Sequence, residues 1–557
     1  MTKLRLGRYT AWILCLVLLA VGVMLEPSGF WGWVLVAVPG LLALLGLWDV
    51  LQREHAVLRN YPVIGHIRWL VEMIRPEIRQ YLLESEDEAT PFSRAQRSLV
   101  YRRAKAISSD HPFGTLADVY ARDYEFVQHS TCPVDPPDPG TFRITIGNDQ
   151  CGQPYSASIF NISAMSFGSL SANAIRALNK GAALGGFYHD TGEGSVSPYH
   201  REFGGDIVWE IASGYFGCRT AEGRFDPERF AAQAGDPQIK MIEIKLSQGA
   251  KPGHGGILPG KKVTPEIAET RGVAAGVDCV SPARHSAFTT PLEMMAFVTQ
   301  LRRLSGGKPV GFKLCIGHPW EFMAIVKAML ETGVVPDFVV VDGGEGGTGA
   351  APVEFSDHLG VPMREGLLFV HNVLTGAGLR DRIRIGVAGR LISAFDIAAV
   401  LAIGADWANA ARGYMFALGC IQSMNCHTNR CPTGVATQDK SRQRALVVPD
   451  KAERVRHFHD RTVNALADML AAAGLSHPDE LQPHHVVHRV SSTELRQFDQ
   501  VHRFLQPGEL VSGQCKFPYY ADNWNKARPD TWAQGNPSPA RSNGLQPSPA
   551  APTDQRP

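Results

Sequence analysis

Three cysteines within one short segment point most directly to chemistry. Five residues separate Cys420 from Cys426, four separate Cys426 from Cys431, and Pro432 follows the last. These intervals do not form the paired knuckles of a structural zinc site, and no second pair lies nearby. Closely spaced thiolates on a loop with an adjacent proline are typical of iron–sulfur ligands, and three of them suit a cluster of three irons. Zinc, with His427 as a further ligand, and three unrelated cysteines are the alternatives.

The other cysteines call for no special chemistry. Ten cysteines in 557 residues are too sparse for a disulfide scaffold. Single cysteines are most often small buried apolar residues, and we interpret these as such. The seven isolated cysteines are Cys15, Cys132, Cys151, Cys218, Cys279, Cys315 and Cys515.

The middle of the chain has the pattern of the elements that would position a site. Between residues 155 and 420, short apolar runs alternate with helix-length segments, as in parallel βα units. Eight runs predict strands, which is the number that closes a (β/α)8 TIM barrel, although a doubly wound open sheet remains an alternative. A short piece at Cys279–Val280 is assigned to an excursion. The predicted strands are Ile159–Met165, Gly186–His189, Ile207–Ser213, Met241–Leu246, Val310–Cys315, Phe338–Val341, Ile383–Val387 and Asp406–Ala410.

Small and polar residues gather where these strands end, and the ligand face of a barrel requires them there. Glycine lets backbone amides approach a phosphate or a flat ring, because no Cβ intervenes. Turns after the last two strands form the usual phosphate site of a barrel. The strand-end segments are Ser166 to Gly168, Thr191 to Gly194, Gln248 to Gly253, Asp342 to Thr348, Gly389 with Arg390, and Ala411 to Gly413.

Two apolar runs near the N-terminus predict a transmembrane hairpin. Tyr9–Leu25 has about the minimum spanning length, and a second run extends from Phe30 to about Trp48. Positive residues flank the pair on both outer sides, and none lies in the turn, so both termini are expected in the cytoplasm. We therefore expect a multi-pass protein of the inner (cytoplasmic) membrane with a cytoplasmic catalytic part. A signal peptide followed by an exported enzyme is the alternative.

The remaining organisation follows from composition. An apolar fraction of 44%, a charged fraction of 20% and a net charge of +1 are ordinary for a globular protein and favour no nucleic-acid partner. Apolar residues at helical spacing between Ile67 and Ile74 predict a helix that lies on the membrane or packs on the barrel. The expected parts are a hairpin at 1–52, a helical pre-barrel region at 53–150, the barrel with its iron–sulfur loop at 151–440, a helical extension at 441–526 and a disordered tail at 527–557.

These motifs resemble the FMN-binding synthase domain of the glutamate synthase family, over roughly residues 155 to 440. The most specific run is GCIQSMNCHTNRCPTGVATQ (Gly419–Gln438), which looks like the family's [3Fe–4S] segment in spacing and flanks. ISAMSFGSLS (Ile162–Ser171), QGAKPGHGG (Gln248–Gly256) and DGGEGGTGA (Asp342–Ala350) also match. The resemblance implies a (β/α)8 flavoenzyme that carries FMN and a [3Fe–4S] cluster held by the three cysteines.

The resemblance also implies residue roles. Ser163, Ala164 and Met165 would border the FMN ring, and Lys313 would lie near its polar edge. The catalytic residues would be Glu193, Lys251 and Arg271, which match positions that hold 2-oxoglutarate or its imine; an Arg fork and a Lys charge suit a dicarboxylate. Gly389, Arg390 and the amides near Arg412 and Gly413 would hold the FMN phosphate. The other residues expected around the cofactor are Ser166, Gln248, Asp342, Gly343, Gly344, Gly346, Gly347 and Ala411.

The chain departs from the family pattern in three places. Ile257 stands where the family's run has Gln, which leaves the identity of the 2-oxo acid open. From the resemblance we expect a membrane hairpin in place of the family's N-terminal glutaminase domain and no counterpart of its C-terminal β-helical domain, so the chain is not expected to hydrolyse glutamine. Ammonia is therefore expected from solution or from a separate glutaminase subunit.

The expected reaction is the reduction of 2-iminoglutarate, formed from 2-oxoglutarate and ammonia, to L-glutamate. An unidentified electron donor would supply the electrons. The alternatives are a membrane-associated flavin and iron–sulfur electron-transfer protein, a reductase of another 2-oxo acid imine, and a barrel kept only as an assembly scaffold.

Overall fold

The structure is a computed structural model that describes the chain except for residues 1–6, 26, 86–89, 111 and 535–557. The chain divides into two compact units, Met1–Arg94 and Ala95–Pro557. Two of the positive residues that precede the predicted hairpin, Lys3 and Arg5, lie outside the described residues, as does most of the tail expected from residue 527.

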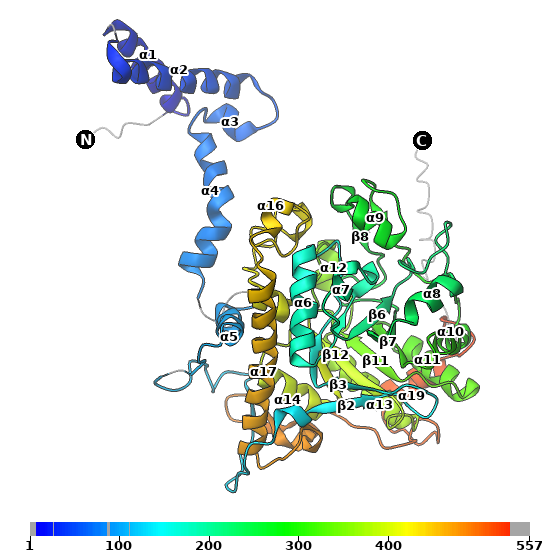
Figure 1. Cartoon of the computed structure of the whole chain (residues 1–557). Helices are drawn as coiled ribbons and strands as arrows, with labels where there is room; N and C mark the ends of the chain where they lie inside the picture. Colours follow the sequence, from blue (N-terminus) through cyan, green and yellow to red (C-terminus); the bar gives the residue numbers. More distant parts are fainter. Residues whose placement is uncertain (1–6, 26, 86–89, 111, 535–557) are drawn as a thin grey trace, which may run out of the picture. The chain divides into compact units, whose positions relative to one another are not determined.

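The second unit is built on a closed barrel of eight parallel strands, which confirms the predicted (β/α)8 architecture and excludes the open sheet (Figure 1). The strands are hydrogen-bonded in the closed order β4, β5, β6, β7, β10, β11, β12, β13. Their bounds are β4 Phe160–Ile162, β5 His189–Asp190, β6 Ile207–Ile211, β7 Ile239–Lys245, β10 Val310–Leu314, β11 Phe338–Asp342, β12 Arg384–Ala388 and β13 Trp407–Ala410.

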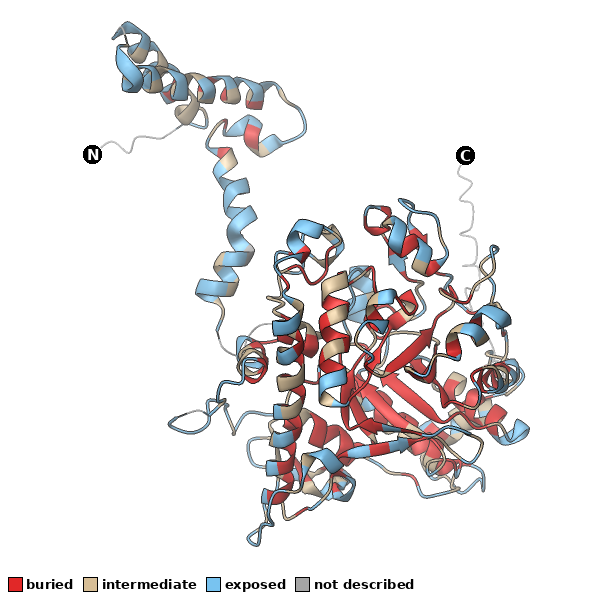
Figure 2. Ribbon diagram, viewed as in Figure 1, coloured by how far each residue is buried: buried red, intermediate tan, exposed pale blue. Residues whose placement is uncertain are grey.

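These strands are buried on both faces, as Figure 2 shows by their colour. Every residue of β6, β10 and β13 is buried, because helices cover the outside of the barrel and side chains fill its inside. The second strand starts later than the Gly186–His189 that was predicted. Gly186 has φ of 67° and ends helix α6 (Ala172–Gly185) as a left-handed cap, so the strand forms only after this turn.

The helices around the barrel mostly begin with a side-chain cap or a proline, as expected for short connections. The long helix α17 (Val448–Ala472) lies beside α6, where Gly181 allows the contact, since a Cβ there would lie 2.5 Å from Val455 Cγ1 (Figure 1). The other helices of the second unit are α5 Arg94–Ala104 (whose first residue belongs to the first unit), α7 Pro198–Arg201, α8 Pro227–Ala234, α9 Pro265–Arg271, α10 Pro291–Leu304, α11 Pro319–Thr332, α12 Val353–His358, α13 Met363–Gly376, α14 Ala394–Ile403, α15 Arg412–Leu418, α16 Lys440–Gln443, α18 Phe498–Val501 and α19 Pro518–Lys526.

Three small antiparallel sheets accompany the barrel. The predicted excursion at Cys279–Val280 is strand β9, and it pairs with β8 (Ile257–Leu258). Strands β2 (Arg143–Ile146) and β3 (Tyr155–Ser158) form a hairpin that precedes the barrel. The third sheet joins segments far apart in the chain, in the order β1 (Glu125–Val127), β14 (Val486–Arg489) and β15 (Leu495–Gln497).

The first unit contains two apolar helices that pack on each other, α1 (Thr10–Met24) and α2 (Gly29–Leu51). Trp12 Nε1 donates to the carbonyl of Ala43 at 2.9 Å, and most of the large apolar side chains of both helices are exposed. Within the described residues, only α2 is long and apolar enough to cross a membrane. Helix α3 (Ala56–Asn60) follows, and then α4 (Gly65–Ile78), which confirms the helix predicted around Ile67 to Ile74.

Candidate functional site

The predicted catalytic residues meet at the carboxyl ends of the barrel strands. Glu193 follows β5, Lys251 lies on the loop after β7, and Arg271 ends α9 in the excursion that contains β8 and β9. Lys251 and Arg271 are 6% and 2% exposed. Both cations lie close enough to Glu193 to lower the pKa of its carboxyl group. The structure therefore brings together three residues that are separated by up to 78 positions in the sequence.

Glu193 is held as a carboxylate by a residue that the sequence reasoning missed. Lys245 Nζ, at the end of β7, lies 2.8 Å from Glu193 Oε2 and donates to Gln248 Oε1 at 2.7 Å. Burial alone would raise the pKa of Glu193, but the charge and hydrogen bond of Lys245, aided by Arg271 and Lys251, lower it to about 2. Glu193 is therefore an acceptor and a fixed negative charge at neutral pH.

Arg271 and Lys251 are buried cations with free capacity to bind an anion. Neither has a carboxylate oxygen within 4.0 Å in the described part of the chain. Arg271 Nη2 donates to the carbonyl of Phe167 at 3.0 Å, while its Nε is buried without a hydrogen-bond partner. A buried, unpaired donor of this kind is costly unless a ligand satisfies it. The two cations therefore suit a substrate with two carboxylates.

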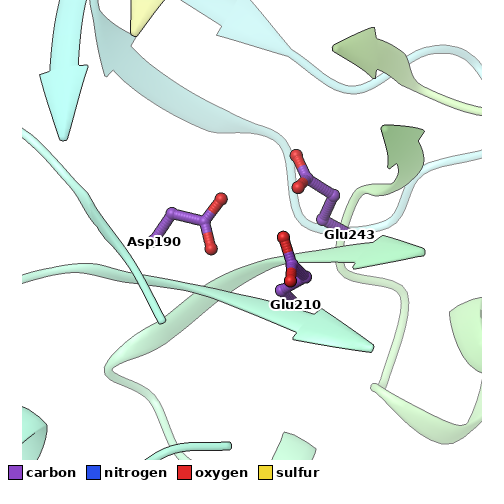
Figure 3. Close-up of side chains that lie close together, drawn as sticks. All are labelled: Asp190, Glu210 and Glu243. Carbon is purple, nitrogen blue, oxygen red and sulfur yellow. The ribbon is translucent and has the colours of Figure 1, made fainter. Parts of the chain in front are cut away.

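Beneath this rim, the barrel interior contains a cluster of three carboxylates around one lysine. The oxygens of Asp190, Glu210 and Glu243 lie within 4.8 Å of one another, and Figure 3 shows the three carboxyl groups pointing together. Lys313 Nζ pairs with Glu210 and lies 2.9 Å from Glu243 Oε1. Burial and the neighbouring carboxylates raise the pKa of Asp190 well above its usual value, and burial raises that of Glu243. Lys245 Nζ lies 3.7 Å from Glu210 Oε1, so two lysines supply positive charge to this cluster.

Two arginines come together at the predicted phosphate turns. Arg412 Nη2 and Arg390 Nε donate to the same carbonyl, that of Glu345, at 2.9 and 3.4 Å. Burial and the nearby charge of Arg390 lower the pKa of Arg412 to about 10. The carboxylates of Asp342 and Glu345 act against this shift, and two guanidinium groups at one turn can bind an anion such as a phosphate. Arg390 itself has φ of 53°, a left-handed conformation that marks a sharp turn after β12.

The predicted glycines allow neighbouring strand-end loops to touch by their backbones. A Cβ on Gly249 would lie 1.6 Å from the carbonyl oxygen of Gly343, and the amide of Gly249 donates to Asp342 Oδ2 at 2.8 Å. A Cβ on Gly389 would lie 2.8 Å from Met363 Cβ. Glycine at these positions is therefore required for the close packing of the strand-end loops.

The first strand end connects to its neighbours by backbone hydrogen bonds. The amide of Ser163 donates to the carbonyl of Ala410 at 3.0 Å, and Met165 N donates to Asp190 O at 3.4 Å. Ser163, Met165 and Ser166 are buried with exposures of 7–9%. Segments that follow β4, β5 and β13 thus lie side by side at the rim.

The three cysteines lie near one another after α15. Burial raises the pKa of Cys420 to about 12, and the charges of Cys426 and Cys431 act in the same direction. Among the described side chains, the group of three potential metal ligands whose atoms all lie within 4.8 Å of one another is the carboxylate cluster. The three cysteines do not form such a group.

Comparisons with known proteins agree with this architecture. Residues 143–476 match the family described as the conserved region in glutamate synthase. The glutamate synthase large subunit-like protein YerD of Bacillus subtilis (strain 168) is 36% identical over 534 residues, which cover 88% of this chain and 99% of that protein. The archaeal-type glutamate synthase [NADPH] of Thermotoga neapolitana is 33% identical over 57% of this chain and 60% of its own length. The chain thus spans less than two thirds of the latter relative.

Solved structures resemble the fold more distantly. The flavin-binding domain of baker's yeast flavocytochrome b2 has a TM-score of 0.37 and 11% identity, covering 76% of this chain and 85% of that one. A likeness at this level carries no argument about the site. The family match and the relative from Bacillus subtilis do: the chain belongs to the glutamate synthase family of oxidoreductases that act on CH–NH2 donors.

Proposed function

We propose that this chain is an FMN- and iron–sulfur-dependent oxidoreductase that reduces 2-iminoglutarate, formed from 2-oxoglutarate and ammonia, to L-glutamate. One observation carries the substrate class. Lys251 and Arg271 are buried at the barrel rim beside ionised Glu193, and neither has a carboxylate partner in the described part of the chain. Two unpaired cations next to one fixed anion favour a small dicarboxylate that carries a polar N–H group.

FMN fits the residues at the strand ends. Its phosphate would lie at Arg390 and Arg412, which share one carbonyl and repel each other. Gly249 and Gly389 let the strand-end loops pack closely around this site, because a Cβ on Gly249 would meet Gly343 O and a Cβ on Gly389 would meet Met363 Cβ. Lys313 would be the cation beneath the polar edge of the ring. When bound, reduced FMN supplies a hydride, and the protein supplies position and charge.

The three-cysteine segment fits an iron–sulfur cluster better than zinc, because its intervals of five and four residues do not form the paired knuckles of a zinc site and a proline follows the last cysteine. Cys420, Cys426 and Cys431 would hold a [3Fe–4S] cluster, which supplies single electrons. The electron donor is outside the chain. Ammonia would come from solution or from a separate glutaminase subunit.

The protein residues have separate tasks in this proposal. Arg271 and Lys251 hold the two carboxylates and so fix the imine carbon in one orientation. Glu193 accepts a hydrogen bond from the imine nitrogen, and Lys245 keeps Glu193 ionised for this purpose. The low pKa of Glu193 makes it an orienting group and not the proton donor.

The test uses the full chain purified in detergent. Its visible spectrum and its iron, sulfide and flavin content are measured first, and the flavin is then reduced without oxygen. We expect 2-oxoglutarate plus ammonium to reoxidise the flavin and to yield glutamate, whereas either compound alone does not. Reduced enzyme that contains both cofactors and is not reoxidised by the pair would overturn the proposed reaction.

We also propose that α2 anchors the chain in the cytoplasmic membrane, that α1, whose 15 residues fall short of a full span, packs against it within the hairpin predicted from the sequence, and that the barrel lies in the cytoplasm. Support comes from the 23-residue length of α2 and from the exposure of apolar side chains such as Leu35, Leu41 and Leu44, which are 65–68% exposed. Such an anchor favours the second candidate function, electron transfer at the membrane.

The anchor is tested on membranes from cells that express the full chain. We expect the protein to resist extraction by sodium carbonate and to dissolve in detergent, while a chain that begins at residue 53 is found in the soluble fraction. Release of the full chain by carbonate would refute the anchor and leave the enzyme proposal unchanged.

A further inference from the structure

The ammonium of Lys262 is buried against the three-cysteine segment. Lys262 ends the 3₁₀ turn Gly260–Lys262 and is 3% exposed. Its Nζ donates to the carbonyls of Cys426 at 3.1 Å, Ser169 at 3.2 Å and Ala436 at 3.4 Å. A lysine ammonium has three protons, so all of its hydrogen-bonding capacity is used on backbone oxygens.

This buried charge has no carboxylate to balance it. Within the described residues, no Asp or Glu oxygen lies within 4.0 Å of Lys262 Nζ. Burial lowers the pKa of Lys262 to about 8, and negative charge on Cys426 and Cys431 acts in the opposite direction, toward the charged ammonium. An unbalanced buried cation is strongly unfavourable, and three neutral carbonyls offset only part of the cost. A negatively charged group bound at the cysteines would therefore stabilise the ammonium of Lys262.

Lys262 also belongs to a set of contacts that joins the cysteine segment to the candidate substrate residues. Four consecutive carbonyls of the loop after β4, those of residues 167–170, each accept a side-chain hydrogen bond from another segment. Arg271 donates to the first, Lys262 to the third, and Gln438, which follows the cysteines, to the second and the fourth. A shift of the cysteine segment would thus be transmitted to the loop that holds Arg271.

We propose that Lys262 is a positioning residue that fixes the three-cysteine segment and supplies the positive charge that raises the reduction potential of the group held there. This inference rests on the proposed iron–sulfur cluster. Each electron that enters such a cluster makes it more negative, so a fixed cation in a low-dielectric environment stabilises the reduced form more than the oxidised form.

The experiment measures the midpoint potential of the full chain by mediated titration with dithionite, followed by electron paramagnetic resonance, together with iron, sulfide and flavin content. Lys262→Gln removes the charge and keeps hydrogen-bond donors, Lys262→Arg keeps the charge, and Lys261→Gln is the matched control on the exposed neighbour. We expect the equilibrium constant for one-electron reduction to fall at least tenfold in Lys262→Gln, a shift of about 59 mV to lower potential. Lys262→Arg and Lys261→Gln should stay close to the parent.

The outcomes separate this inference from the proposed function. A parent chain without iron and sulfide refutes the proposed cluster itself. If the parent contains a cluster and Lys262→Gln has the same iron content and the same potential, only the role of Lys262 is overturned. A folded Lys262→Gln variant that keeps its flavin but loses iron supports the positioning role, provided that Lys262→Arg keeps its iron. If Lys262→Gln does not fold, the Lys262→Arg variant decides the question. The inference is overturned if folded Lys262→Arg loses the cluster or if its equilibrium constant for one-electron reduction changes tenfold. It is supported if the iron content and the potential of Lys262→Arg match those of the parent.

Discussion

Replacing Lys313 by methionine tests the charge balance inside the barrel. Lys313 is the ammonium that lies among Asp190, Glu210 and Glu243, and it pairs with the last two. Lys313, Glu210 and Glu243 have side chains that are 4%, 1% and 2% exposed, so water cannot replace the lost charge. Methionine keeps most of the volume, and the change therefore isolates electrostatics from packing.

Removing one partner of a buried ion pair typically costs about 3–5 kcal/mol, because the other charge stays buried and uncompensated. We expect a loss of this size at pH 8. The loss should shrink at lower pH, because burial already raises the pKa of Asp190 and Glu243 in the parent and removal of the ammonium should raise these pKa values further. The folded variant then binds more protons than the unfolded chain, and its stability rises as the pH falls, by about 1.4 kcal/mol per pH unit for each extra proton.

The assay is urea unfolding of the flavin-free proteins at pH 8 and pH 5.5, followed by circular dichroism. Glu243→Gln is the control, because it removes one of the crowded carboxylates and leaves Lys313 paired with Glu210. We expect this control to stay within about 1.5 kcal/mol of the parent. The reasoning is refuted if Lys313→Met loses the same free energy at both pH values, or less than about 1 kcal/mol at pH 8.

Three further predictions concern the rim and the cysteines. Arg271→Met should raise the KM for 2-oxoglutarate by about 10- to 100-fold, because it loses charged hydrogen bonds worth about 1.5–3 kcal/mol. Steady-state kinetics measure this change, and the KM for a monocarboxylate 2-oxo acid should change less. Cys426→Ala should abolish the cluster and leave flavin binding, and full iron content in this variant would disprove the ligand assignment. Gly249→Ala should abolish flavin retention or folding, because its Cβ would lie 1.6 Å from Gly343 O. Gly349→Ala is the control, since a Cβ there would have no atom within 4 Å, and it should match the parent in flavin content and melting temperature.

The barrel strands could be predicted from the sequence because each is a buried apolar run bounded by turn residues. The fifth strand was predicted at Val310–Cys315 and forms Val310–Leu314, and the sixth was predicted at Phe338–Val341 and forms Phe338–Asp342. The start of the second strand was wrong, because a left-handed glycine that caps the preceding helix has the same residue type as a strand-edge glycine.

The charged groups inside the barrel could not be predicted in the same way. Alternation indicates that Glu243 and Lys245 of β7 share a face, but it does not say which residues of neighbouring strands lie beside them. That depends on the stagger of the closed sheet, which pairs Glu210 with Glu243 and Lys313 with Lys245. The cluster around Lys313 and the partner of Glu193 are consequences of this register.

The sequence can predict which residues lie at the candidate site, because it shows which residues follow strands. It cannot predict the protonation state of their side chains. In a parallel βα barrel, every strand ends on the same face, so polar residues that follow strands must meet there whatever the register. Protonation, however, depends on which atoms are neighbours. Glu193 was expected to hold 2-oxoglutarate or its imine, and Lys245 Nζ lies 2.8 Å from its carboxylate and keeps it ionised. The proton for the product nitrogen must therefore come from another group or from water, and Glu193→Gln should weaken substrate orientation without introducing a new pKa near neutral pH into the rate profile.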